Sequence, residues 1–434
     1  MLKNFVSLTV RGALTLAVAV LPIWIADYYK IAPWNETSAF ALRWDVLLIT
    51  TLVLFLLIFL WNRLFSKSKH EAVKESSIPY SRLDQIVHNL AFGSSMLQNL
   101  LADFETRWST EWVDIPVSKP VFITSLPRSG TTIILETLNR LPGLATHTYR
   151  DMPFLLTPVA WSKLSAKFRR QSEHRERAHG DGLQVNEDSP EAFEEILWRK
   201  HYRKKYTKKG IQLWKGSNEK FKERFVDHIK KIISLRSAST EKPARYVSKN
   251  NANIARVETI KSMFDDAIIL VPLRDPIDHA VSMWRQHKNF TEQHEREPFV
   301  KKYMADIGHF EFGALHRPIQ FPGLNEMTSE FQPDSINYWV AYWLVAFEFL
   351  ATQEQVRILR YERFCVLGAK GLTRVCEVID LDASTEEIEI AVRILKAPSK
   401  TKGGTREINQ DLIKRSTELH NRLSEKCILK GIDG

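Results

Sequence analysis

A short apolar segment followed at once by a glycine-containing loop constrains the fold of this chain more than any other feature. Residues 120–125 read Pro-Val-Phe-Ile-Thr-Ser, which is typical of a buried strand, and the tight loop 126–132 follows directly. A helical pattern begins at about residue 132 and ends at Leu-Pro-Gly, residues 141–143. A strand, a tight loop and a helix N-terminus in this order present backbone N–H groups to an anion. The segment therefore predicts an α/β fold with a phosphate or sulfate site.

Further apolar runs along the chain predict the rest of a sheet. They cover residues 244–248, 267–273 and 356–361, and helical stretches such as 253–264 separate them. Strands that alternate with helices indicate a parallel sheet covered on both faces. The very apolar segment 335–350 is too short to cross a membrane and contains Glu348, so we expect a buried core helix there. Segments 162–182 and 199–209 are dense in charge, which is typical of solvated helices or a lid.

The loop carries the side chains that an anion site needs. Ser129, Thr131 and Thr132 supply hydroxyl donors, Gly130 permits the tight turn, and Arg128 adds a planar charged fork. The alternative is an ordinary turn between a strand and a helix, with hydroxyls that cap the helix.

The same loop lacks the lysine of a nucleoside triphosphate site. Thr131 stands where the lysine of GxxxxGK[ST] would be, and Ser125 stands where its first glycine would be. We therefore expect no site for β,γ-phosphates and Mg²⁺.

A second motif follows the strand predicted at 267–273. Arg274 comes at the end of that strand, and Asp275 and Pro276 suit the cap and the first position of a helix that runs through His287. Arg274 should thus lie at the carboxyl edge of the sheet beside the first loop, with Ser282 two turns into the helix. Together they would form a second anion site. The alternative is that Arg274 pairs with Asp275 and that Ser282 is a passive surface hydroxyl.

The two motifs together resemble those of sulfotransferases that use 3′-phosphoadenosine 5′-phosphosulfate (PAPS), closest to the bacterial, carbohydrate and tyrosylprotein branch. Residues 127–132 resemble the loop that binds the 5′-phosphosulfate, and residues 274–282 resemble the 3′-phosphate motif. Lys249 stands where many members carry a lysine near the transferred sulfate, and Tyr361 lies where the late strand of the family ends in Tyr-Glu. The resemblance runs from about residue 120 to 402. It implies a P-loop-like α/β sulfotransferase fold, PAPS as co-substrate and no metal.

The chain departs from the family pattern in two places. Many relatives carry a proline soon after the lysine, where this chain has Asn250 and Asn251. Some relatives carry a catalytic glutamate about twenty residues past the loop, where residues 147–151 read His-Thr-Tyr-Arg-Asp. The identity of the catalytic base is therefore left open.

Sulfuryl transfer needs a base for the acceptor hydroxyl, cations near the sulfate and exact placement. Arg128 and Lys249 are the residues that we expect to stabilise charge, and Asp151 is the first choice for the base. His147, Asp181 and Glu191 are the next choices for that base. The alternative for Asp151 is a salt bridge to Arg150. Residues 179–182 and the acidic string 187–195 are alternative acceptor contacts.

Two apolar segments precede this domain. Residues 5–25 and 44–65 are each long enough for a transmembrane helix, and Trp24, Trp44 and Trp61 lie near their ends. We expect a membrane anchor in residues 1–65, a polar linker in 66–79 and the sulfotransferase domain in 80–434. The alternative for the first segment is a cleaved signal peptide.

Basic residues predict the orientation of this anchor. They are Lys3 and Arg11 at the start of the first segment and Arg63, Lys67 and Lys69 at and after the end of the second. The positive-inside rule then places both ends and the catalytic domain in the cytoplasm. The sequence contains three cysteines and no CxxC pair, which argues against a disulfide framework.

The net charge of +10 suits an anionic ligand, a membrane surface or nucleic acid, and does not choose among them. The motifs favour a membrane sulfotransferase that acts on a hydroxyl group of a glycan, lipid or protein. The alternatives are a P-loop kinase or NTPase and a non-catalytic membrane scaffold with a degenerate nucleotide fold. A nucleic-acid binder that uses the patch 199–209 has no recognition motif to support it.

Overall fold

A computed structural model describes residues 85, 88–89, 92, 95–108, 111–165, 175–176, 184–185, 189–191, 193–237, 244–397 and 407–432. These residues belong to the compact unit Ser77–Gly434. Both expected membrane segments, the linker 66–79, residues 179–182 with Asp181, and the end of the family resemblance near 402 lie outside the described residues. Within the described ranges, no helix is both long and apolar enough to cross a membrane.

A parallel sheet forms the centre of the fold. Its strands are β1 (Val121–Ile123), β2 (Leu144–Ala145), β5 (Arg245–Lys249), β6 (Ile268–Leu273) and β7 (Val356–Arg360). They lie in the order β2-β5-β1-β6-β7, and every neighbouring pair is parallel. A separate antiparallel pair joins β3 (Arg175–Glu176) to β4 (Gln184–Val185). The expected α/β fold with a central parallel sheet is therefore confirmed.

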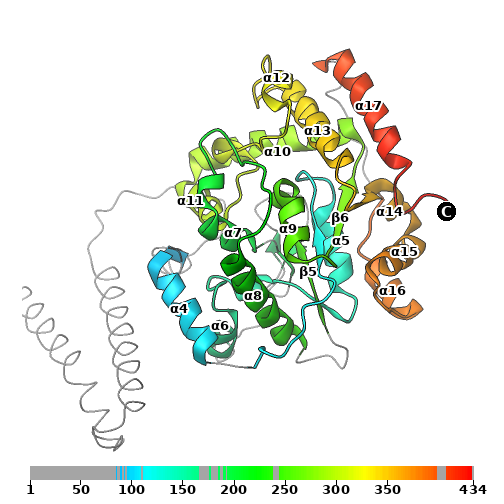
Figure 1. Ribbon diagram of the computed structural model, residues 1–434. Helices are drawn as coiled ribbons and strands as arrows, with labels where there is room; N and C mark the ends of the chain where they lie inside the picture. Colours follow the sequence, from blue (N-terminus) through cyan, green and yellow to red (C-terminus); the bar gives the residue numbers. More distant parts are fainter. Residues whose placement is uncertain are drawn as a thin grey trace, which may run out of the picture. The chain divides into compact units, whose positions relative to one another are not determined.

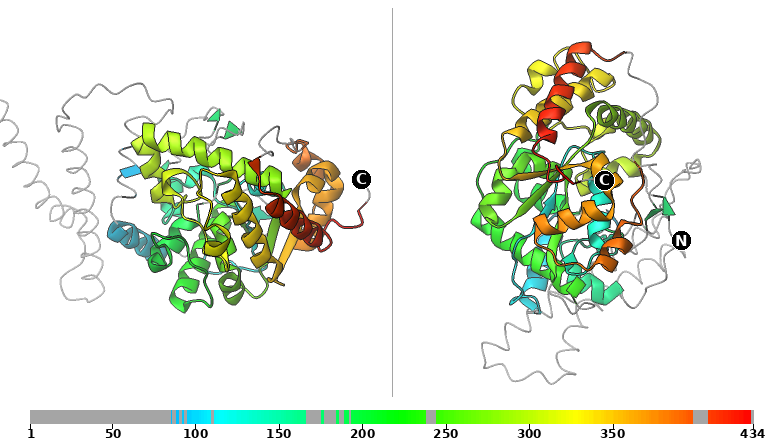
Figure 2. Two further views of the ribbon diagram at one scale, coloured as in Figure 1. Left: turned by 90° about the horizontal axis from the view of Figure 1, so that it is seen from above. Right: turned by 90° about the vertical axis from the view of Figure 1, so that its right-hand side faces the viewer.

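Helices cover both faces of this sheet, and their bounds follow. They are α4 (Ser95–Trp108), α5 (Thr131–Asn139), α6 (Pro158–Ser165), α7 (Glu195–His201), α8 (Glu219–Ser237), α9 (Val257–Met263), α10 (Pro276–Arg296), α11 (Pro298–Ile307), α12 (Leu324–Met327), α13 (Ile336–Ala351), α14 (Tyr361–Leu367), α15 (Ala369–Ile379), α16 (Thr385–Val392) and α17 (Gln410–Ser424). Short 3₁₀ turns are η1 (Tyr149–Asp151), η3 (Arg203–Lys205), η4 (Asn251–Arg256) and η5 (Gly313–Leu315). Figures 1 and 2 show α14, α15 and α16 gathered on the side of the sheet away from α8.

Alternation along the strands divides the core into two apolar clusters. Phe122 belongs to the larger cluster with α8, α9, α10 and α13, whereas Val121 and Ile123 belong to the cluster with α5, α14, α15 and α16. This is the expected consequence of side chains that point to opposite faces of a strand. The predicted motifs lie at or just after the carboxyl ends of β1, β5, β6 and β7.

The apolar segment predicted as a core helix is α13. Trp339, Trp343 and Phe347 are all buried, and the Ser335 hydroxyl accepts a hydrogen bond from the Asn337 amide at the start of the helix. The helix after Arg274 runs to Arg296, beyond the end that we predicted at His287. Its buried residues recur along the whole length, so packing extends it.

An aromatic cluster holds α7 and α8 to the larger core. Trp198 is fully buried, and its ring contacts those of Trp214, Phe221 and Phe225 at centroid distances of 4.6–5.4 Å. The Arg256 guanidinium lies 4.4 Å from the centroid of the Trp198 ring. The Trp198 side chain therefore joins α7 and α8 to Arg256 in η4, which follows β5.

Replacing Trp198 with alanine should lower the free energy of unfolding by about 3–5 kcal/mol, because the cavity would lack all these ring contacts. Urea unfolding followed by circular dichroism would measure the loss. The matched control is Val366→Ala on α14, where the side chain is 72% exposed. It should change the same free energy by less than about 0.5 kcal/mol. Equal losses in both variants would contradict this account of the core.

Candidate active site

The loop after β1 is fixed to the sheet and to α14. The Ser125 hydroxyl donates to the Pro272 carbonyl oxygen at 2.9 Å, which ties the loop to β6. Gly130 precedes α5 with φ of 96°, in the left-handed region. A Cβ at this position would lie 2.2 Å from Cδ2 of Tyr361. Tyr361 therefore packs directly on the loop, and the loop requires glycine for both its backbone angle and its lack of a side chain.

The two predicted motifs meet at Arg128. Its Nε donates to the Ser282 hydroxyl at 3.3 Å, and Arg274 Nη1 donates to the Arg128 carbonyl oxygen at 2.9 Å. Arg128 has φ of 73°, which costs energy for a residue with a side chain. Asp275 accepts hydrogen bonds from the Ile277 and Asp278 amides and so caps α10. The structure thus brings Arg128, Arg274 and Ser282 to one corner of the sheet edge.

Ser129 has the one feature in this loop that points to a ligand. Its side chain is 0% exposed, and its hydroxyl has no hydrogen-bond partner within the described part of the chain. A buried hydroxyl that lacks a partner costs about 1–3 kcal/mol. An oxygen of a bound phosphate or sulfate would remove this cost. Thr132 lies in the first turn of α5, beside the same loop.

Lys249 ends β5 at the same edge. The next residue, Asn250, donates its backbone N–H to the Ile123 carbonyl oxygen at 3.0 Å, so β5 ends beside the start of the loop. The Lys249 ammonium is buried 3.9 Å from Glu191 Oε1. Glu191 Oε2 also accepts a hydrogen bond from the Tyr149 hydroxyl at 2.7 Å. Glu191 is therefore the counterion that holds this lysine.

Asn250 and Asn251, which follow Lys249, have defined partners. The Asn250 amide donates to Glu195 Oε2 at 2.7 Å, and its carbonyl oxygen accepts from the Ala252 amide at the start of η4. Asn251 Oδ1 accepts from the Thr131 hydroxyl at 3.3 Å. The sequence did not reveal this role, because the contacts with Glu195 and Thr131 join segments far apart in the chain.

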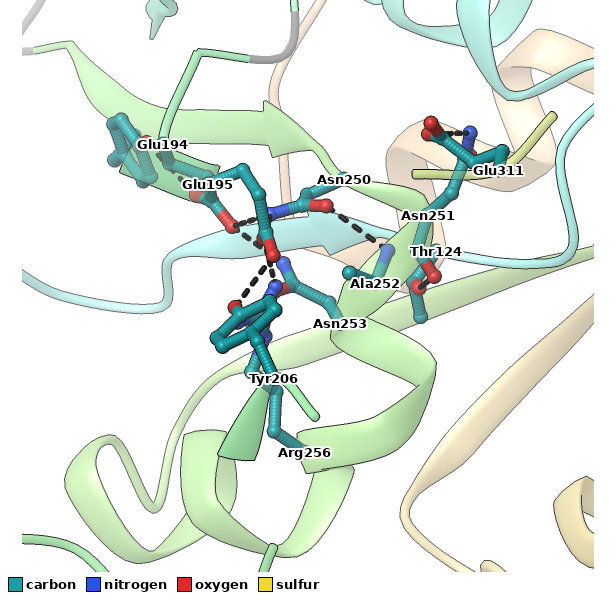
Figure 3. A network of polar contacts seen from close by, with 11 residues as sticks. Thr124, Glu194, Glu195, Tyr206, Asn250, Asn251, Ala252, Asn253, Arg256 and Glu311 are labelled. Atoms are coloured by element: carbon teal, nitrogen blue, oxygen red, sulfur yellow. Dashed lines mark hydrogen bonds and ion pairs between the residues drawn. The ribbon is translucent and has the colours of Figure 1, made fainter. Parts of the chain in front are cut away.

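A buried polar network lies behind Asn250, as Figure 3 shows. Arg256 pairs with Glu195, and Glu195 Oε1 accepts from the Tyr206 hydroxyl. Asn253 donates to Glu194. Burial would lower the pKa of Arg256, but the Glu195 carboxylate raises it above its usual range. Part of the acidic string that we considered as an acceptor contact thus turns inward and supports η4.

Asp151 has partners that do not suit a general base. It accepts from the Thr148 amide at 2.9 Å and from Arg236 Nη2 at 2.6 Å, and it lies 3.4 Å from His147 Nδ1. Burial would raise the pKa of Asp151, yet the neighbouring His147 ring and the charge of Arg236 lower it to about 2. A carboxyl that is so acidic accepts a proton poorly. Arg236 is a cation that pairs with Asp151, whereas the alternative drawn from the sequence was a salt bridge to Arg150.

His147 lies deeper in the same cluster. Its Nε2 is 2.9 Å from Nε2 of His228, and both rings are buried. Burial holds the pKa of His228 well below its usual range. Asp151, His147 and Glu191 are the predicted bases that lie within the described residues. Glu191 is the one of these three that contacts Lys249.

The described residues contain no group of three His, Cys, Asp or Glu side chains that could hold a metal ion.

A pocket of about 570 Å³, open to solvent, lies beside the loop. Its lining residues are Leu126, Pro127, Glu195, Ile211, Asn250, Asn251, Ala252, Gly308, His309, Phe310, Glu311, His316, Arg317, Ile319 and Tyr342.

Comparison with known proteins gives a family match. A family model described as the sulfotransferase family matches residues 120–385. Comparison with curated proteins finds no match.

Solved structures similar to this chain are also sulfotransferases. Sulfotransferase STF1 from Mycobacterium tuberculosis H37Rv is 14% identical with a TM-score of 0.43, over 78% of this chain and 85% of that one. STF9 from Mycobacterium avium is 14% identical with a TM-score of 0.42, over 96% of each chain. Mouse sulfotransferase SULT7A1 complexed with PAP is 12% identical with a TM-score of 0.28, over 76% of this chain and 92% of that one.

Replacing Asp151 with asparagine should lower the free energy of unfolding by about 3–5 kcal/mol, because it leaves Arg236 without its buried partner. The ionised carboxylate stabilises the fold fully above its unfolded pKa of about 3.9. This stabilisation is lost as the pH falls through the folded pKa of about 2. The difference between wild type and variant should therefore shrink below pH of about 4. Urea unfolding at a series of pH values would measure it.

The control for this variant is Asp411→Asn, since Asp411 forms an exposed pair with Arg415. That variant should unfold as the wild type does at every pH. A difference for Asp151→Asn that stays constant from pH 7 to pH 2 would contradict the ionic role of Asp151.

Proposed function

This chain belongs to the sulfotransferase family, and we propose that it transfers a sulfuryl group from PAPS to a hydroxyl acceptor. The observation that carries the proposal is the meeting of two anion-binding motifs at one corner of the sheet. Arg128 contacts Ser282, and Arg274 holds the Arg128 carbonyl. A co-substrate with phosphate at both the 5′ and 3′ positions requires two such motifs side by side.

The residues present fit this co-substrate. The backbone N–H groups of the loop and the N-terminus of α5 favour the 5′ anion, and the buried Ser129 hydroxyl would donate to it. Arg274 and Ser282 would hold the 3′-phosphate, with Tyr361 packed beside them. Thr131 stands in the position of the Walker lysine and bonds to Asn251 instead. This arrangement favours a phosphosulfate over a nucleoside triphosphate with Mg²⁺.

Lys249 and Arg128 are the groups that we propose to act on the transferred group. As the acceptor oxygen bonds to sulfur, the bond from sulfur to the nucleotide oxygen breaks and negative charge grows on that oxygen. A lysine held at the sheet edge can stabilise this charge without reorganising. Glu191 fixes the position of Lys249 from the other side. We propose that Asp151 supports η1 rather than transferring the proton, because it pairs with Arg236.

The first test of this proposal is the choice of nucleotide. The protein should bind adenosine 3′,5′-bisphosphate far more tightly than ATP, without a Mg²⁺ requirement. Gly130→Ala should weaken bisphosphate binding by about tenfold or more, since the new methyl group would collide with Tyr361 and shift the loop. Isothermal calorimetry would measure both affinities.

The matched control is Gly216→Ala. Gly216 has φ of 70°, also in the left-handed region, but a Cβ there meets nothing within 4 Å. The variant carries a similar backbone strain away from the loop, so its bisphosphate affinity should equal that of the wild type. Equal affinity for bisphosphate and ATP would refute the proposed co-substrate, and so would a strict need for Mg²⁺.

We also propose that two helices in residues 1–65 anchor the domain to a membrane, with the catalytic domain on the cytoplasmic side. The apolar lengths of residues 5–25 and 44–65 and the basic residues that flank them support this proposal. Reporter fusions after residues 30 and 75 should lie on opposite sides of the membrane. If both reporters lie on the same side, the two-span topology is wrong.

A further inference from the structure

The pocket beside the loop adjoins both elements that we propose to hold the transferred group. Leu126 and Pro127 in its wall directly precede Arg128, and Asn250 and Asn251 directly follow Lys249. The opposite wall comes mainly from residues 308–319, the segment between α11 and α12 that includes η5. A hydroxyl group bound in this pocket would therefore lie next to the proposed sulfate site.

Glu311 projects into this pocket from the opposite wall. Its Oε1 accepts from Asn251 Nδ2 at 3.4 Å, its Oε2 lies 3.7 Å from His309 Nδ1, and its side chain is 25% exposed. Figure 3 shows the Glu311 carboxylate facing Asn251. The same Asn251 side chain accepts from the Thr131 hydroxyl of the anion loop. One carboxamide thus separates the carboxylate from the first hydroxyl of α5.

The charge of Glu311 has no role in binding an anion. A carboxylate so close to a phosphosulfate repels it, and the repulsion is strong where water is partly excluded. A neutral hydroxyl acceptor, in contrast, needs a hydrogen-bond acceptor that can also take its proton. The Glu311 carboxylate lies where it can accept this hydrogen bond and then take the proton.

Three other carboxylates of this region are each paired with a strong cation. Glu191 pairs with Lys249, Glu195 with Arg256 and Asp151 with Arg236. Such pairing stabilises the ionised form and makes the carboxylate a weaker base. The contacts of Glu311 are an amide and a histidine ring, and it opens on the pocket.

We propose that Glu311 is the general base of the transfer, a conclusion that rests on the proposed function. The acceptor hydroxyl gives its proton to a Glu311 carboxylate oxygen while its oxygen forms a bond to sulfur. The bond from sulfur to the nucleotide oxygen breaks, and adenosine 3′,5′-bisphosphate leaves with that electron pair. Asn251 is a positioning residue, because its amide links Glu311 to the loop.

Glu311→Gln tests this assignment, since it keeps the shape of the side chain and removes the base. The probes are water, 2-naphthol and 4-nitrophenol with labelled PAPS in single-turnover reactions. Rates with water and 2-naphthol should fall by about a hundredfold or more. The rate with 4-nitrophenol, which is itself ionised near neutral pH, should change by less than about threefold. Calorimetry should give the same bisphosphate affinity as the wild type, or a slightly higher one.

The control is Glu326→Gln, which changes an exposed glutamate on α12 and should leave all rates unchanged. An equal loss with both phenols would show that Glu311 has a structural role only, and a normal rate with 2-naphthol would exclude it as the base. Wild-type protein that binds bisphosphate but transfers to none of the three probes would also count against Glu311, because a base in an open pocket should activate water. Failure of the wild type to bind bisphosphate would instead refute the proposed function.

Discussion

The site depends on the hydrogen bond from the Arg274 guanidinium to the Arg128 carbonyl oxygen. Arg128 has a left-handed backbone that is unfavourable for any residue with a side chain, so this conformation needs support from its surroundings. Arg274 gives that support from the end of β6, and Ser282 receives the Arg128 side chain from α10. Because Tyr361 closes over Gly130 from β7 and α14, three strand ends define the shape of one loop.

The residues at the end of β5 also lie at this edge of the sheet, and a different set of contacts fixes them. Lys249 and Asn250 follow one another, yet their side chains have different partners. Lys249 contacts Glu191, whereas Asn250 contacts Glu195 and the network that includes Arg256. The buried network therefore fixes the backbone on which the lysine sits. Such a fully bonded set of polar groups is rigid, which suits a reaction that depends on placement.

Much of this arrangement could be predicted from sequence, because the determining signals are local. The apolar runs predicted β1, β5, β6 and β7, and the cap formed by Asp275 and Pro276 predicted the start of α10. By contrast, β2 is only two residues long, which is too short for a periodic pattern, and the sequence did not reveal it. The partner of Asp151 could not be found either, since Arg236 is 85 positions away along the chain. The sequence did not reveal Asn251 and Glu311 for the same reason, because their side chains contact each other across 60 positions of the chain.

The most direct measurement of the central claim is a crystal structure of the protein with adenosine 3′,5′-bisphosphate. The account predicts that the 5′-phosphate lies on the loop within hydrogen-bond distance of the Ser129 hydroxyl, which has no partner in the described part of the chain without ligand. It predicts the 3′-phosphate beside Arg274 and Ser282. A bisphosphate bound elsewhere, or bound with its 3′-phosphate away from both residues, would contradict the account.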